Sequence, residues 1–138
     1  MTPRSSSTAI WRSLGAIFAG ILTGIILTLG TDALLQRAGV IPPQGQPATS
    51  DPLLLATLYR TIYGVIASYI TARLAPYKPM AHVLVAGAMG VAANALGAIA
   101  TWNKNLGPHW YPIALTLLAL PTAWVGGRLW LAKHPGTR

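Results

Sequence analysis

Residues 11–35 read WRSLGAIFAGILTGIILTLGTDALL, and this stretch decides the class of fold. After Arg12, the only charged side chain in it is Asp32. A bilayer core about 30 Å thick is crossed by roughly 20 helical residues, because a helix rises about 1.5 Å per residue. The stretch is therefore long enough and apolar enough to cross a membrane as a helix.

The composition of the whole chain also favours a membrane protein. Its 138 residues are 53% apolar and only 9% charged, whereas soluble domains carry about 25% charged residues. The mean hydropathy is +0.51. Because so few charges cannot cover a water-facing surface, we expect the lipid bilayer to be the solvent and the main partner of this chain.

Three further apolar stretches follow the first one. We predict an all-α polytopic membrane protein with four transmembrane helices in an up-down-up-down bundle, forming a single domain over residues 1–138. The predicted helices cover residues 11–36, 53–75, 79–101 and 110–132.

Helix-breaking residues mark the expected helix ends. Gly39 can close the last turn of the first helix. Asp51 is placed to cap the second helix, with Pro52 in its first helical position. Pro76 and Pro79 bracket so short a link that the second and third helices should form an antiparallel hairpin.

Two other features concern loops and helix shape. Residues 39–51 form a polar loop that contains Pro and Gly, and we expect it to be mobile. Pro121 lies deep inside the fourth predicted helix and should kink it, since proline removes a backbone hydrogen bond.

A cleaved secretory signal peptide is the alternative interpretation of the first stretch, because Arg4 and Arg12 precede an apolar run. A membrane helix is the better interpretation. The polar leader is long, the apolar core of residues 14–29 exceeds the usual length of about 7–15 residues, and residues 31–33 make a poor cleavage site.

The positions of Lys and Arg predict the orientation, since these residues are enriched on the cytoplasmic side of membranes. With both ends inside, Arg37 and Lys104 lie outside and Arg60 lies in the outer half of the membrane. We expect a bacterial cytoplasmic (cell inner) membrane protein with cytoplasmic N- and C-termini. The residues then on the inner side are Arg4, Arg12, Arg73, Lys78, Arg128, Lys133 and Arg138.

The candidate binding residues are Asp32, Arg60 and Asn94, which lie within the predicted spans. Ionisable groups there are costly and usually face protein or a water-filled cavity. Each of the three belongs to a row of small residues spaced by four, and such rows share a helix face and permit close helix packing. We therefore predict that the three side chains meet between the first three helices, with an Asp32–Arg60 ion pair. The rows are Ala16-Gly20-Gly24-Thr28-Asp32, Arg60-Gly64-Ser68-Ala72 and Ala86-Gly90-Asn94-Ala98.

Two roles for this cluster are open. The preferred one is architectural, because a buried pair offsets the cost of two buried charges and fixes helix register. The other makes the cluster the wall of a polar cavity for a small ligand, an ion or a lipid headgroup.

Four polar residues around Arg60 receive a simpler interpretation. Thr57 and Thr61 should bond to the preceding turn of their own helix. Tyr59 and Tyr63 are of the type that anchors helices near membrane interfaces.

Signatures of catalysis, metal binding and nucleic-acid binding are missing from the sequence. It has no Glu and no Cys, and His82, His109 and His134 are dispersed along the chain. Neither a phosphate-binding loop nor a nucleophile motif occurs, and the basic residues fall singly between apolar runs. We therefore expect no enzyme activity, cofactor, metal ion or nucleic-acid partner.

The leading functional expectation is a non-catalytic membrane protein that acts through helix packing, as a homo-oligomer or a small accessory subunit of a larger membrane complex. The GxxxG motif at residues 20–24 supports close helix packing. The alternative is a small oligomeric transporter or channel, with the polar cluster in the outer half of the bundle lining its path. No motif is specific enough to assign a family.

Overall fold

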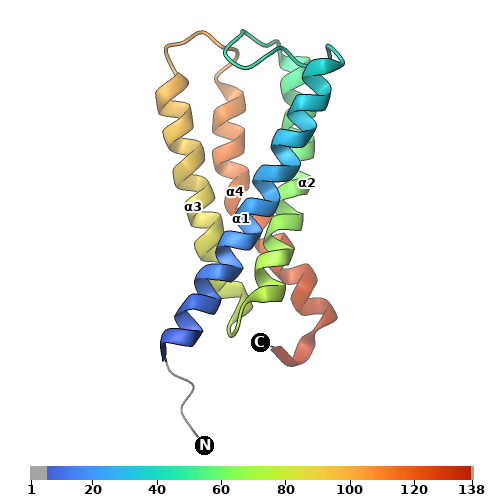
Figure 1. Cartoon of the computed structure of the whole chain (residues 1–138). Helices are drawn as coiled ribbons and strands as arrows, with labels where there is room; N and C mark the ends of the chain where they lie inside the picture. Colours follow the sequence, from blue (N-terminus) through green and yellow to red (C-terminus); the bar gives the residue numbers. More distant parts are fainter. Residues whose placement is uncertain (1–5, 138) are drawn as a thin grey trace, which may run out of the picture.

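The structure is a computed structural model that describes residues 6–137. Its four long helices alternate in direction, and each is long and apolar enough to span a membrane (Figure 1). The predicted all-α fold with four membrane-spanning helices is confirmed. The elements are α1 (Ser6–Arg37), α2 (Ser50–Leu74), α3 (Pro79–Thr101), α4 (Trp110–Lys133) and a short 3₁₀ turn, η1 (Pro135–Thr137).

The C-terminal end of α1 follows the prediction in detail. Gly39 has a positive φ of 71°. Its N–H donates to the carbonyl of Gln36, and the N–H of Val40 donates to the carbonyl of Leu35. This pair of bonds satisfies carbonyls that the helix end leaves free. Glycine suits this position because it adopts a positive φ without steric cost.

The predicted start of α2 is wrong, because the helix begins three residues before the predicted residue 53 and two before Pro52, the predicted first helical position. The helix begins at Ser50, and its N-cap is Thr49, whose side chain makes no capping hydrogen bond. Asp51 instead lies inside the first turn, where its negative charge is favourable next to the helix N-terminus. Pro52 is the third helical residue, still within the turn whose N–H groups have no partner in the helix. α1 also begins earlier than predicted, at Ser6.

The helices do not pack in sequence order. α1 packs mainly on α2, α2 packs on α4, and α4 packs on α3, whereas α1 and α3 have few contacts. The central pair, α2 and α4, therefore runs parallel. At the end that carries the longer loops, α1 and α3 lie far apart (Figure 1).

Glycines mark the places where these helices cross closely. A Cβ at Gly20 of α1 would overlap the hydroxyl of Thr71 on α2. A Cβ at Gly64 of α2 would lie 2.7 Å from Cγ2 of Thr122 on α4. The small-residue rows are thus used for packing inside a single chain, and the first glycine of the GxxxG motif faces α2.

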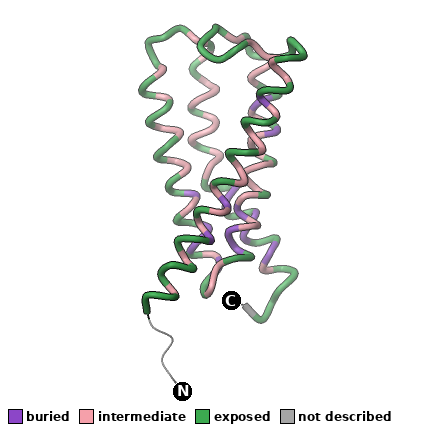
Figure 2. Tube along the Cα trace, viewed as in Figure 1, coloured by how far each residue is buried: buried purple, intermediate pink, exposed green. Residues whose placement is uncertain are grey.

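The tightly packed part of the molecule is the half near the α2–α3 link, residues 75–78. The main buried cluster there consists of Ala72, Val83, Ala123 and Trp130. Figure 2 shows most of the buried positions in this half. The opposite half, toward the longer loops, is packed more loosely.

The longer loops, residues 38–49 and 102–109, define what we call the loop end of the bundle. They are joined to each other, because the N–H of Ala48 donates to the carbonyl of Leu106 at 2.8 Å. Gly107 follows with a φ of 153°, and a Cβ there would lie 2.8 Å from the Ala48 carbonyl oxygen. The loop that was predicted to be mobile is therefore tied to its neighbour.

α4 remains helical through Pro121. Its lower part leans away from its upper part in Figure 1. A change of direction is the expected effect of a proline inside a helix.

Candidate functional site

Asp32 and Arg60 form an ion pair at the loop end, as the sequence predicts. Nη2 of Arg60 lies 2.7 Å from Oδ2 of Asp32. The pair follows from the antiparallel packing of α1 and α2, which sets Gly20 against Thr71 and Thr31 against Tyr63. Asp32 is only 5% exposed, so its charge depends on this partner and on hydrogen bonds.

Tyr59 completes the partners of the carboxylate. Its hydroxyl donates to the second oxygen of Asp32, and the ring is only 8% exposed. Interpreting this tyrosine as an interface anchor is therefore wrong. Tyr63, one turn further, shares a hydrogen bond with Thr31 at 2.6 Å. The spacing of four between the two tyrosines was the available signal, since it places both on one face of α2.

The interpretation of the neighbouring threonines is confirmed. The hydroxyl of Thr57 donates to the carbonyl of Leu53 at 2.8 Å, and that of Thr61 to the carbonyl of Thr57 at 2.7 Å. Both bonds lie within α2. These hydroxyls are satisfied locally and give no sign of a ligand.

Asn94 does not bond to the ion pair. Its side-chain amide donates to the carbonyl of Leu115 on α4 at 3.1 Å. This happens because α3 packs on α4, so its row of small residues faces α4 and not α1. The predicted three-residue cluster is therefore corrected to a charged pair and a separate amide, although all three residues line one pocket.

The three histidines have local partners. In each case a ring nitrogen donates to the backbone carbonyl of a residue four or seven positions earlier. Within residues 6–137, no three His, Cys, Asp or Glu side chains are grouped closely enough to hold a metal ion.

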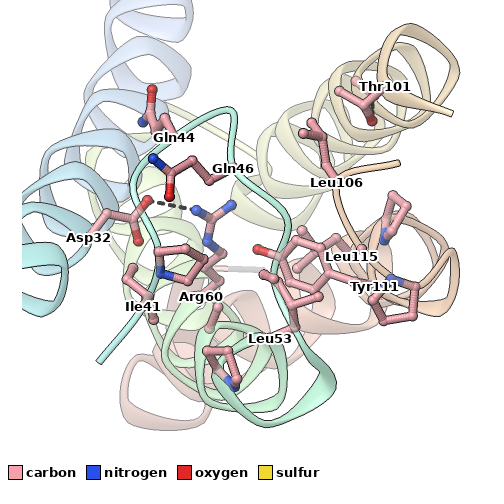
Figure 3. A pocket seen from close by; sticks show the side chains of 18 of the residues that line it. Asp32, Ile41, Gln44, Gln46, Leu53, Arg60, Thr101, Leu106, Tyr111 and Leu115 are labelled. Atoms are coloured by element: carbon pink, nitrogen blue, oxygen red, sulfur yellow. Dashed lines mark hydrogen bonds and ion pairs between the residues drawn. The ribbon is translucent and has the colours of Figure 1, made fainter. Parts of the chain in front are cut away.

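A pocket of about 400 Å³ lies at the loop end, between the two long loops and the adjoining turns of the four helices. We call it the loop-end pocket. Asp32 and Arg60 are the only Asp, Glu, Lys or Arg among the residues that line it. Figure 3 shows the ion pair on the wall of this pocket, which Gln46 and Tyr111 also line. The centre of the Tyr111 ring is 5.9 Å from the guanidinium carbon.

Arg60 keeps unused hydrogen-bond donors at this pocket. A guanidinium has five N–H donors, and their partners among the described residues are the Asp32 carboxylate and the Tyr59 hydroxyl, which leaves donors of this 32% exposed side chain free. The Nε atom is buried and has no partner there. Buried polar groups are nearly always paired, so this arrangement is suited to an additional acceptor.

A second cavity of about 360 Å³ continues from the first toward the middle of the bundle. We call it the lateral groove. It runs between α1 and α3 over small residues of α2 and α4, and Arg60, Asn94 and Leu115 line both cavities. On its rim, Ile25 and Leu29 of α1 are 48% and 53% exposed. The groove therefore opens sideways, toward the lipid.

The fold defines a class, a polytopic all-α membrane protein with four helices that can span the bilayer. Comparison with protein-family models, curated proteins and solved structures finds no match to this chain. The function is therefore argued from the two cavities.

Proposed function

We propose that the chain is a non-catalytic membrane protein that binds a ligand in the loop-end pocket. The observation that carries the proposal is the uneven packing of the bundle. One half is closely packed around Val83, and the other holds a pocket with a charged pair on its wall. A purely architectural pair would not require unused Arg60 donors beside an open volume.

The geometry favours binding over an open channel. The close-packed cluster of Ala72, Val83, Ala123 and Trp130 supports a bundle that is closed at this end over one with a continuous path along its axis. A transport role would need a second conformation in which these contacts open. Both oxygens of Asp32 already accept hydrogen bonds, which leaves no free carboxylate for acid-base chemistry and supports a non-catalytic role.

Water access to the pocket is the direct test, and the chain suits it because it contains no native cysteine. Gly97 lines the pocket, and nothing lies within 4 Å of a Cβ built there. We expect a water-soluble thiol reagent to modify the Gly97→Cys variant about tenfold faster than the Leu96→Cys variant, because thiols ionise poorly in lipid. Leu96 is the adjacent residue and is 67% exposed on the outside of the bundle, so it controls for depth.

Equal, slow modification of both variants would show that the pocket is closed to water and would overturn the proposal. Equal, rapid modification would mean that α3 is not embedded at this depth. The modification rates of both variants are measured in intact membranes, with the reagent added from either side.

The second candidate function is the small accessory subunit or homo-oligomer. The lateral groove supports it, since a helix of another chain could fill the gap that α1 and α3 leave open. Mass determination of the protein extracted in mild detergent tests this candidate. A polypeptide retained in fixed ratio would favour it over ligand binding.

We also propose a location in a bacterial cytoplasmic membrane with both ends in the cytoplasm. The first turn of α1 and the last turn of α4 lie at the same end of the bundle (Figure 1). The described basic residues near that end are Arg12, Arg73, Lys78, Arg128 and Lys133, and Arg4 and Arg138 lie outside the described residues. Their excess favours the cytoplasmic side.

Fusions to the C-terminus test this orientation. A fluorescent protein that matures only in the cytoplasm is expected to be bright after residue 138, and a periplasmic phosphatase is expected to be inactive there. An active phosphatase at this position would reverse the orientation. The same phosphatase inserted after Gly45, in the α1–α2 loop, is the matched control and is expected to be active.

A further inference from the structure

We propose that the loop-end pocket and the lateral groove together bind one membrane phospholipid, with the phosphate at Arg60 and an acyl chain in the groove. This inference rests on the proposed function and names the class of ligand. It commits to a phospholipid of the leaflet next to the loop end.

The first argument is the continuity of the two cavities. The loop-end pocket and the lateral groove meet at Arg60, Asn94 and Leu115. Both are lined mainly by apolar atoms, and Asp32 and Arg60 are the only Asp, Glu, Lys or Arg of the described chain that line either of them. A ligand with a charged group at Arg60 and a long uncharged part therefore fits both. Phospholipids have this form and are the molecules present in the surrounding bilayer.

The second argument is the chemistry at the junction. Asp32 neutralises the charge of Arg60 but uses only one face of the guanidinium. The remaining donors suit the oxygens of a phosphodiester, which guanidinium groups bind in a bidentate way. Because the protein pair is neutral as a whole, a singly charged or zwitterionic phosphodiester fits better than a multiply charged diphosphate.

The third argument is the size and direction of the groove. Its α1 wall runs from Gly20 to Leu29, which corresponds to about 14 Å along a helix. One leaflet contributes about half of the roughly 30 Å hydrocarbon core. The groove thus runs about one leaflet deep, and its open side allows a lipid to enter from the bilayer without crossing the loops.

Among the glycines that line the groove, Gly90 is the one where an added Cβ makes no close contact with another helix. Gly90 lies on its α3 wall, and a Cβ there would lie 3.7 Å from Cβ of Ala119, which is ordinary contact. A larger side chain at this position would project into the groove. The Gly90→Leu variant therefore blocks the acyl chain, and Ala86→Leu on the same wall is a second blocking variant.

The control for these variants is Gly30→Leu. Gly30 is exposed, lines neither cavity, and has nothing within 4 Å of a built Cβ. The headgroup variant is Arg60→Lys, which keeps a positive charge next to Asp32 but loses the guanidinium fork. It avoids leaving the carboxylate buried without a partner.

The experiment is native mass spectrometry of the full chain reconstituted in vesicles of equal phosphatidylethanolamine and phosphatidylglycerol and released into mild detergent. We expect the native protein and Gly30→Leu to retain one phospholipid. Retention by Arg60→Lys should fall about tenfold, since a hydrogen bond to a charged group contributes enough free energy for such a change. Retention by Gly90→Leu and Ala86→Leu should fall by a similar factor, because the leucine side chain fills space that the acyl chain needs. Diacylglycerol, which lacks the phosphate, should be retained as weakly by the native protein as phospholipid is by Arg60→Lys.

Equal retention of phospholipid by the native, blocking and headgroup variants would overturn the inference. Inorganic phosphate added alone separates the two proposals. One outcome is that phosphate protects Gly97→Cys from the thiol reagent equally well in the presence and absence of Gly90→Leu. The pocket then binds a free anion, which supports the proposed function and overturns the phospholipid as its ligand.

Two further outcomes overturn both proposals. In one, the reagent cannot enter the pocket and no ligand is retained. In the other, a helix of another protein is bound, which supports the accessory-subunit role instead.

Discussion

Replacing Asp32 or Arg60 alone with Leu is expected to lower the free energy of unfolding by about 3 kcal/mol, and replacing both by much less. Each single variant leaves one charge buried without its partner, which is strongly destabilising. The double variant removes both charges and leaves two apolar side chains on the wall of the loop-end pocket. Unfolding in a mixed-detergent titration, followed by far-ultraviolet circular dichroism, measures all three variants.

The matched control is Arg37→Leu. Arg37 is exposed at the end of α1, so the free energy of unfolding should change by less than about 0.5 kcal/mol. Losses that simply add in the double variant would show that Asp32 and Arg60 are not energetically coupled. Strong coupling would leave the ligand proposal intact, because the pair then holds Arg60 in the geometry that the phosphate needs.

Much of the fold could be predicted from the sequence because the bilayer imposes simple rules. Backbone groups in lipid must be paired within the helix, so apolar runs of sufficient length give helices, and Gly39 and Pro79 mark where they end or begin. The start of α2 was missed because Asp51 and Thr49 are both suitable capping residues. Nothing local distinguishes them.

The order of packing could not be predicted in the same way. Rows of small residues show which face of a helix can approach another helix, but not which helix it meets. The row that contains Asn94 faces α4, and its amide bonds to the carbonyl of Leu115. A row on α3 with the same spacing could equally have faced α1, as the sequence analysis assumed.

The ion pair was predictable and its third partner was not. Two opposite charges at similar depth in neighbouring antiparallel helices have few alternatives to pairing. The position of the Tyr59 side chain is less restricted, since tyrosine is also common at membrane interfaces. Only the register of α1 against α2, which brings its hydroxyl to Asp32, assigns it to the site.

The second large effect is expected at Gly126, where α4 crosses α2 most closely. A Cβ there would lie 2.5 Å from the carbonyl oxygen of Val65 and 2.6 Å from Cβ of Ser68. The carbonyl belongs to the backbone of α2 and cannot move aside as a flexible side chain could. Gly126→Ala should therefore force the central helices apart and lower the free energy of unfolding by about 2 kcal/mol.

Gly30→Ala, in contrast, should raise the free energy of unfolding. Nothing lies within 4 Å of a Cβ at Gly30, and alanine is intrinsically more favourable than glycine inside a helix by up to about 1 kcal/mol. Both variants are measured by the same unfolding titration. A Gly126→Ala variant as stable as Gly30→Ala would mean that α2 and α4 are further apart than described. The close-packed half would then no longer be closed, and the argument for a binding pocket over a channel would lose its main support.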